Sequence, residues 1–383
     1  MKILLVAPQP FYRERGTPIA VRLLAEQLCA FGHEVDLLVY HDGEDITIPG
    51  VRLFRAGRPP GVGRVPIGIS LQKLACDVWM IFALLRLLRR NRYEVIHAVE
   101  EMVFPAAILH RFFGARLVYD MDSSLADQLT EKWTFLKPLR RAFEAIERRF
   151  VWRSSLVLAV CEDLAAKVRP WLGDKRVVVL PDVPMAEGDD LPVETLREPG
   201  DEAVLGLYVG NLERYQGIDL LLQALALLAG SPGFRMVIIG GAPKHVRHYH
   251  QLARSLGIPD DRLRLLGARP VAHLGAYLRQ ADILVSPRTL GQNTPMKVYS
   301  YMQAGRAILA TDIRSHTQAL DAGCAMLVPA EPLAMAQGLE QLLRDATLRA
   351  RLGEAARDKA EREYSLPAYQ RKLKIAYAGL QGG

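Results

Sequence analysis

The chain has 383 residues, 50% of them hydrophobic and 24% charged, so it is long enough for two folded domains and too apolar for a disordered protein. Its 49 Lys and Arg against 42 Asp and Glu give a net charge of +7, which is too diffuse for a dedicated nucleic-acid binder. The 4 cysteines lie far apart with no C-x-x-C pair, so neither a zinc site nor a disulfide framework is suggested.

Short apolar runs alternate with helix-length segments through the first half of the chain. Continuous apolar runs of this kind are typical of parallel strands that are buried on both faces. We therefore predict a Rossmann-like domain over residues 1–180. The first run is too short for a signal peptide, so a cytoplasmic location is expected. The predicted strands are residues 2–7, 34–40, 51–54, 95–98, 116–120 and 156–160.

A second alternating series follows a break at residues 181–200, where proline, glycine and acidic residues predict a linker. It predicts a second Rossmann-like domain over residues 201–365, with a cleft between the two domains. Ligands of open parallel sheets bind beyond the carboxyl ends of the strands, so the loops there are the candidate sites. Residues 366–383 are expected to form a helix that returns to the first domain. The predicted strands of the second series are residues 203–210, 235–241, 262–267, 281–287, 307–312 and 324–329.

Four motifs, in this order and spacing, carry a resemblance to a known family. They are "RERGTPIA" (13–20), "VIHAVEE" (95–101), "YVGNLERYQG" (208–217) and "GQNTPMKVYSYMQAG" (291–305). Together they resemble the retaining glycosyltransferases of the two-domain GT-B fold, in the large family 4. The resemblance covers nearly the whole chain and implies an α/β fold with two parallel sheets.

The resemblance implies a nucleotide-sugar donor site in the second domain. The family's Gly-Arg-(x)4-Lys-Gly motif grips the diphosphate, and here Asn211 and Gln216 stand at its two basic positions. The family's Glu-(x)7-Glu motif binds the sugar and the ribose, and here Gln292 and Ser300 replace both glutamates. The donor-binding residues expected on this basis are Gly210, Asn211, Glu213, Arg214, Gln216, Gly240, Gly241, Lys244, Gln292, Asn293, Thr294 and Ser300.

Positive charge for the diphosphate must then come from other side chains. Arg214, Lys244, Arg288 and Lys297 are the nearest candidates, and Arg288 and Lys297 are the expected catalytic cations, which would stabilise the leaving diphosphate. The helix that is expected to start near Pro295 would offer backbone amides to a phosphate. Pro295 is expected in its first turn, Asn293 or Thr294 as its N-cap and Gly305 as its C-terminal stop.

The resemblance also implies an acceptor side in the first domain. His97 is a candidate catalytic residue at a strand end, although a satisfied structural histidine is an equal alternative. Glu100 is a candidate for binding a sugar hydroxyl, and Asp122 lies near the family's usual histidine. The loop after the first strand adds the remaining acceptor-side candidates, Arg13, Arg15, Gly16 and Thr17.

Two stretches suggest contact with a membrane surface. Residues 74–92 form an amphipathic pattern that ends in arginines, but Asp77 and Arg86 interrupt it, so it is not a transmembrane helix. Residues 132–153 mix basic and aromatic side chains. Such composition suits binding to anionic lipid on the inner face of a membrane, although ordinary solvated helices are the alternative.

The expected function is therefore transfer of a sugar, with retention, from a nucleotide-diphosphate sugar to a lipid or glycan acceptor. A UDP-sugar is favoured and a GDP-sugar comes next, with no cofactor, no metal and no nucleic-acid partner. A non-catalytic glycosyltransferase-like binding or regulatory partner is the main alternative, because four ligand positions have changed. An epimerase on the same fold would need more carboxylates and histidines than the motifs offer.

Overall fold

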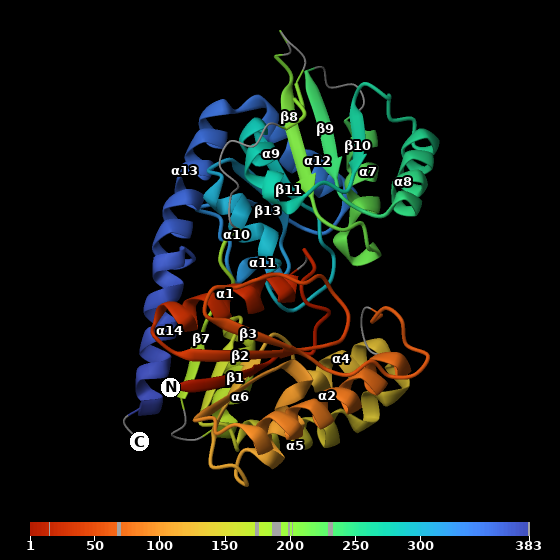
Figure 1. The fold of residues 1–383 in the computed structure, drawn as a ribbon. Helices are drawn as coiled ribbons and strands as arrows, with labels where there is room; N and C mark the ends of the chain where they lie inside the picture. The colour runs from red at the N-terminus through yellow and green to blue at the C-terminus, as the bar shows by residue number, and fades with distance from the viewer. Residues whose placement is uncertain are drawn as a thin grey trace. The chain divides into compact units, whose positions relative to one another are not determined.

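The computed structural model describes residues 1–14, 16–66, 70–172, 176–185, 193–197, 200, 202–228 and 233–381. The chain forms two compact units (Figure 1). Unit 1 contains Met1–Pro181 and Gln370–Gly383, and unit 2 contains Asp182–Tyr369. The described residues between 181 and 200 form no helix or strand.

Unit 1 is built on a seven-stranded sheet in which every pair of neighbouring strands is parallel. The six strands that the apolar runs predicted are all present, and their order is β3-β2-β1-β4-β5-β6-β7. The seventh, at the edge of the sheet, was not predicted. The strands are β1 (Lys2–Val6), β2 (Glu34–Val39), β3 (Val51–Arg55), β4 (Val95–Val99), β5 (Arg116–Met121), β6 (Leu156–Ala159) and β7 (Arg176–Val179).

Helices cover both faces of this sheet. Alternate residues of β4 point to opposite faces. Ile96 packs in a core with α2 (Leu71–Arg90), α3 (Val103–Leu109), α5 (Arg140–Val151) and α6 (Glu162–Leu172). His97 points the other way, to α14 (Leu366–Gln381), where its Nδ1 lies 2.5 Å from the Tyr377 hydroxyl. Gln370 of α14 also bonds Gln27 of α1 (Gly16–Ala30), so the C-terminal helix packs on unit 1 as predicted.

Shorter segments complete unit 1. Residues 132–153, predicted as one basic and aromatic stretch, are divided among three elements. These are the end of α4 (Leu125–Lys132), the 3₁₀ helix η2 (Thr134–Leu139) and α5, and the 3₁₀ helix η2 contains Pro138. The 3₁₀ helix η1 (Glu100–Met102) follows β4 directly. None of the helices that the structure describes is long and apolar enough to cross a membrane.

Unit 2 repeats the same architecture with a six-stranded parallel sheet in the order β10-β9-β8-β11-β12-β13. All six strands were predicted: β8 (Val204–Val209), β9 (Phe234–Ile239), β10 (Leu263–Gly267), β11 (Ile283–Ser286), β12 (Ala307–Thr311) and β13 (Met326–Val328). Its helices are α7 (Ile218–Leu227), α8 (Pro243–Ser255), α9 (Leu274–Gln280), α10 (Met296–Gln303), α11 (Arg314–Thr317), α12 (Pro332–Arg344) and α13 (Ala346–Glu363), with η3 (Arg214–Gln216) and η4 (Val271–His273).

Each sheet reverses its strand order once. The reversal lies between β1 and β4 in unit 1 and between β8 and β11 in unit 2. The loops that leave neighbouring strands in opposite directions at such a point open a crevice beyond the carboxyl ends of the strands. Most of the predicted site residues follow these strands, whereas Gly240, Gly241 and Lys244 follow β9 and Asp122 follows β5.

Candidate active site

Glycines bring the loops of unit 2 close together at its switch point. Gly240, after β9, has φ +124°, and a Cβ there would lie 1.8 Å from the Gly210 carbonyl oxygen. Gly217 has φ +73°, and a Cβ there would lie 1.9 Å from the carbonyl oxygen of Pro287, after β11. Only glycine fits at either position, because side chains would clash with backbone and strain the dihedral angle. These glycines are structural requirements of the crevice.

Lys297 is the central cation of this crevice. It lies in the first turn of α10 and is only 7% exposed. Its Nζ donates to Gln216 Oε1 at 2.9 Å and lies 3.9 Å from the centroid of the Tyr208 ring. Burial, and then the nearby Arg288 charge, lowers the pKa of Lys297 well below its usual range. Gln216, which stands at the position of the family's lysine, thus accepts a hydrogen bond from Lys297 of α10.

Arg288 is the second buried cation and follows β11. Its guanidinium donates to the carbonyls of Leu290 at 2.6 Å and Asn293 at 3.4 Å, and lies 5.4 Å from the centroid of the Tyr215 ring. A Cβ at Gly291 would lie 2.0 Å from its Nη2, so glycine allows the loop to wrap the guanidinium. Burial lowers the pKa of Arg288. Neither Arg288 nor Lys297 forms an ion pair with a carboxylate of the described residues.

A buried histidine, which the sequence reading missed, holds the base of the Arg288 loop. His316 Nδ1 lies 2.9 Å from the Thr311 carbonyl oxygen, so Nδ1 carries the proton and Nε2 accepts from the Ser286 hydroxyl at 2.8 Å. The Thr311 hydroxyl donates to the Arg288 carbonyl. Burial lowers the pKa of His316 to about 4, so the ring is neutral at pH 7. The polar residues that follow β12 in "TDIRSH" were the available signal.

The start of α10 differs from its prediction. The helix begins at Met296 with Pro295 in extended conformation at the N-cap, and no side-chain cap bond is formed. The expected capping by Asn293 or Thr294 and the expected place of Pro295 in the first turn are therefore wrong, because proline takes the cap position itself. The Thr294 hydroxyl is buried and has no hydrogen-bond partner among the described residues. The stop is as predicted, since Gly305 has φ +65° just beyond the helix.

The two positions of the replaced glutamates have different surroundings. Ser300 is buried in α10, and its hydroxyl accepts a hydrogen bond from the Met185 amide at 3.1 Å. Gln292 is exposed, and its carbonyl accepts from the Gln318 side chain. The Gln292 side chain is therefore exposed. The Ser300 hydroxyl is already used in a hydrogen bond within unit 2.

The other predicted donor residues lie in the segments that follow β8 and β9. Asn211 Oδ1 accepts from the Glu213 amide at 3.2 Å, which shapes the turn after β8. Arg214 is exposed in η3, and Lys244 is exposed in the first turn of α8. Gly241 has φ +80° and packs against Leu212. The loops after β8, β9 and β11 thus bring together the residues that sequence motifs far apart had indicated.

Carboxylates, in contrast, gather at the switch point of unit 1. Glu100 follows β4 and has a left-handed backbone, with φ +49°. Its carboxylate accepts a hydrogen bond at 2.9 Å from Nε2 of Gln9, which follows the neighbouring strand β1. Lys73 Nζ of α2 lies 2.5 Å from Glu101 Oε1. Burial and the neighbouring Glu101 charge raise the pKa of Glu100, and the same two causes raise the pKa of Asp77 to about 7. Sequence reading missed Lys73 and Asp77 because they come from a distant helix.

The remaining acceptor-side candidates are placed as follows. His97 is fully buried, with Nε2 3.4 Å from Asp120 Oδ2 and Nδ1 at Tyr377, so its ring is enclosed on the α14 side of the sheet, away from α2. Arg13 donates to both oxygens of Asp42 at 2.8 Å, so its charge is already paired. Gly16 and Thr17 open α1, Asp122 follows β5, and Arg15 lies outside the described residues.

Two family models match this chain. The model described as "Glycosyl transferase 4-like domain" matches residues 15–182, and the one described as "Glycosyl transferases group 1" matches residues 204–345. Together they cover every strand of both sheets except β1.

Curated relatives are similar over part or most of the chain. A D-inositol 3-phosphate glycosyltransferase of Corynebacterium diphtheriae is 31% identical over 178 residues, which is 44% of this chain and 41% of that relative. This chain therefore spans less than half the length of that relative. A phosphatidyl-myo-inositol mannosyltransferase of Mycolicibacterium smegmatis is 27% identical over 360 residues, covering 91% of this chain and 86% of the relative.

Solved structures share the fold at lower identity. A sucrose-phosphate synthase from Thermosynechococcus elongatus aligns with a TM-score of 0.78 and 19% identity, over 99% of this chain and 98% of that one. Anabaena HepE in complex with UDP-glucose aligns with a TM-score of 0.71 and 15% identity, over 99% of this chain and 100% of that one.

Proposed function

The chain belongs to the glycosyl transferases group 1 family, with the GT-B fold, and we propose that it transfers a sugar from a nucleotide-diphosphate sugar to an acceptor hydroxyl. A UDP-sugar is the favoured donor and a GDP-sugar the next. The acceptor is a lipid or a glycan, and transfer retains the anomeric configuration without a metal ion. Two of the relatives are named for action on D-inositol 3-phosphate and on phosphatidyl-myo-inositol.

One observation carries this proposal: Arg288 and Lys297 are buried in one crevice without a carboxylate partner among the described residues. Buried charges in proteins are normally paired, since an unpaired one costs several kcal/mol. A pair of cations in this state calls for an anionic ligand. A diphosphate would supply the missing charge and restore the lowered pKa of Lys297.

The proposed chemistry follows from this charge arrangement. The bond between the sugar C1 and the diphosphate oxygen breaks, and the acceptor oxygen forms its bond to C1 on the same face. The acceptor proton passes to the departing diphosphate. Arg288 and Lys297 stabilise the negative charge that develops there, which is the main electrostatic task of such a site. Gln216 and the His316 network hold these two cations in place.

A direct test begins with the nucleotide. We expect UDP, and then GDP, to raise the thermal unfolding temperature of the chain, and Lys297→Met to abolish that rise. Turnover is then followed as UDP release from UDP-sugars with inositol, inositol phosphate and phosphatidylinositol, and the product anomer is assigned by NMR. Nucleotide binding without sugar transfer to any acceptor would favour the non-catalytic partner instead.

Metal independence is tested separately. The two buried cations occupy the role that a divalent ion would otherwise have at the diphosphate. Activity is therefore expected to persist in EDTA, and loss of activity that Mg²⁺ or Mn²⁺ restores would contradict this part of the proposal.

A further inference from the structure

We propose that the outer sides of α2, α3, η2 and α5 in unit 1 form a docking face for an anionic lipid bilayer. We call this surface the outer helical face. The proposal rests on the proposed function in that the enzyme would meet a lipid-linked acceptor at this surface.

The helices of this face share one side of the unit 1 sheet. Met80 of α2, Ala106 of α3 and Val151 of α5 are buried in the same core cluster. The Phe104 and Phe150 rings of α3 and α5 meet edge to face with centroids 4.9 Å apart. Because the inner sides of all three helices are occupied by this core, their outer sides face away from the sheet in the same direction, as Figure 1 shows for α2 and α5.

Large apolar side chains are concentrated on the outer helical face. Of 16 exposed large hydrophobic residues in the described chain, 10 lie on these elements or just after them, so their distribution is uneven. On α2 they are Leu71, Leu74, Val78 and Phe82, spaced three or four residues apart along one side of the helix. Phe112 is 80% exposed beyond α3. Contiguous patches of this kind on a folded domain mark interaction surfaces.

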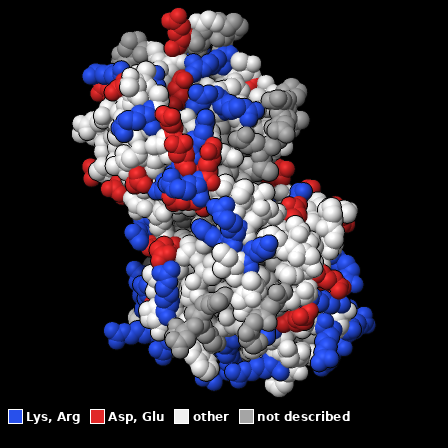
Figure 2. Space-filling view, turned by 90° about the vertical axis from the view of Figure 1, so that its left-hand side faces the viewer, with Lys and Arg blue, Asp and Glu red and all other residues white. Residues whose placement is uncertain are grey.

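The most exposed charged residues on the same elements are basic. Arg89 and Arg90 end α2, and Arg141, Arg148 and Arg149 lie on α5. The acids Asp77 and Glu144 are partly exposed, and each has a partner, the Tyr40 hydroxyl and Arg140 respectively. Lys and Arg line the lower end of unit 1 in Figure 2, where α2 and α5 lie in Figure 1. Apolar side chains interleaved with arginine are the composition of a helix that lies on anionic lipid.

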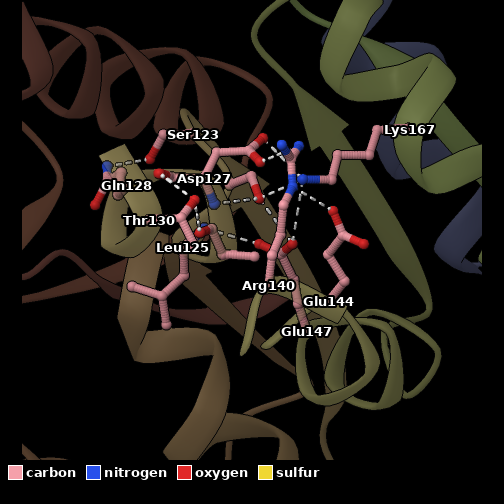
Figure 3. Close-up of polar contacts among 11 residues, drawn as sticks. Ser123, Leu125, Asp127, Gln128, Thr130, Arg140, Glu144, Glu147 and Lys167 are labelled. Atoms are coloured by element: carbon pink, nitrogen blue, oxygen red, sulfur yellow. Dashed lines mark hydrogen bonds and ion pairs between the residues drawn. The ribbon is translucent and has the colours of Figure 1, made fainter. Parts of the chain in front are cut away.

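The acids of this region are bonded to neighbouring groups, which leaves positive charge in excess on the face. Glu144 of α5, whose side chain is 31% exposed, pairs with Arg140. Glu147 of α5 is buried and accepts from the Ser124 hydroxyl at 2.8 Å and the Leu125 amide at 2.9 Å. Asp127 of α4 binds Lys167 of α6 at 2.8 Å and Arg140 at 2.8 Å (Figure 3). These contacts neutralise the acids within unit 1 and fix α4 and α5 to α6. The outward arginines of α5 remain available to lipid phosphates.

A bilayer fits this face better than a second copy of the chain. A symmetric dimer places the same patch of both copies in contact. Here that contact would bring arginines against arginines, with only the partly exposed Glu144, already paired with Arg140, between them, which is unfavourable. An anionic leaflet supplies both an apolar layer for the hydrophobic side chains and phosphates for the arginines.

The test is flotation of the full chain with vesicles of phosphatidylcholine, with and without phosphatidylglycerol. We expect binding to the anionic vesicles only, weakening as salt is added. Each basic residue near an anionic leaflet contributes roughly a fivefold factor in partitioning, so Arg148→Ala with Arg149→Ala should weaken binding about 25-fold. Phe82→Ser should weaken it severalfold by removing an apolar contact.

Matched controls come from α14 on the opposite side of the same sheet. Ile375 is 67% exposed, close to the 61% of Phe82, and Arg371 and Lys374 are exposed beside it. Ile375→Ser, and Arg371→Ala with Lys374→Ala, should leave vesicle binding unchanged. Equal loss in these controls, no preference for anionic vesicles, or a dimer broken by Phe82→Ser would overturn the proposal. Thermal shift with UDP runs in parallel, because loss of the UDP response alone would refute the donor site and leave the docking face standing.

Discussion

The two units of this chain place opposite charges at equivalent positions. In each unit the polar residues gather where the sheet reverses its strand order. In unit 2 the loops there bury Arg288 and Lys297 without a carboxylate partner among the described residues. In unit 1 they bring together Asp77, Glu100 and Glu101. Sheet topology therefore decides where a ligand can bind, and the side chains of the loops decide which charge it carries.

The pKa directions express the same contrast. Burial lowers the pKa of Lys297 and Arg288 and raises the pKa of Glu100 and Asp77. Each group is thus held in surroundings that disfavour its charged form. An anion would relieve unit 2, whereas carboxyls with raised pKa values suit a neutral, hydroxyl-bearing ligand in unit 1.

The largest expected effect comes from removing the central cation of unit 2. Lys297→Met should weaken UDP binding by about 3 kcal/mol, or roughly 100-fold, because a buried charge-assisted contact to the diphosphate is lost. The ligand-free chain should become more stable, since methionine fills the space without an unpaired charge. Calorimetric titration and thermal unfolding measure the two effects. Arg254→Met, at an exposed position of α8 outside the predicted donor residues, is the control, and a similar loss there would remove the distinction.

The next effect should appear only on the acceptor side. Glu100→Gln keeps the shape of the side chain and an oxygen for Gln9, but removes the ability to take up a proton. We expect kcat/KM for the acceptor to fall about tenfold while the UDP affinity stays the same, which corresponds to about 1.4 kcal/mol. Steady-state kinetics with the acceptor varied measure this. A change in UDP affinity would show that the two half-sites are not separable.

Acid should affect the two units in opposite directions. The pKa of Asp77 is raised from 3.8 to about 7, so the folded state holds a proton that the unfolded chain has lost, and unit 1 loses stability as the pH rises through this range. The pKa of His316 is lowered from 6.5 to about 4, so the unfolded chain binds a proton first, and unit 2 loses stability as the pH falls from about 6.5 to 4. After allowance for solvent screening, about 1 kcal/mol is expected in each unit.

Hydrogen exchange of strand peptides from each unit, corrected for intrinsic rates, distinguishes these slopes. Between pH 7.5 and pH 5, protection should rise in unit 1 and fall in unit 2. Asp77→Asn should reduce the first slope, to which Glu100 also contributes, and His316→Asn should flatten the second. If protection changed with pH in the same direction in both units, the predicted difference between unit 1 and unit 2 would be wrong.

Much of the fold was readable because parallel strands buried on both faces appear as continuous apolar runs. β7 was missed although residues 177–180 form a continuous apolar run of the same kind, which lies directly before the predicted linker. The glycine loops were also readable, because Gly217 and Gly240 mark positions that no other residue can occupy.

The polar partners were not readable, because they depend on contacts across the fold. Gln216 looked like a lost cation, yet it is the acceptor for Lys297, 81 residues away in the sequence. Asp77 looked like an interruption of an apolar helix, yet it joins the carboxylates of unit 1. Arg13 looked like an available cation beside a helix start, yet Asp42 binds it with both oxygens. Motif spacing predicted the loops, and only tertiary structure showed how their charges are paired.

The smallest effect should come from the paired cation of unit 1. Arg13 lies 2.8 Å from Asp42, which also accepts from the Val65 amide at 2.7 Å, so Arg13→Ala breaks an ion pair that is partly exposed. Such pairs contribute about 0.5–1 kcal/mol, and the variant should lose that stability while UDP binding stays unchanged. Urea unfolding and calorimetric titration measure both. Loss of one cation would then destabilise the chain where it is paired and stabilise it, in Lys297→Met, where it is not. A gain in stability for Arg13→Ala would show that the presence of a carboxylate partner does not explain the different effects of the Arg13 and Lys297 substitutions.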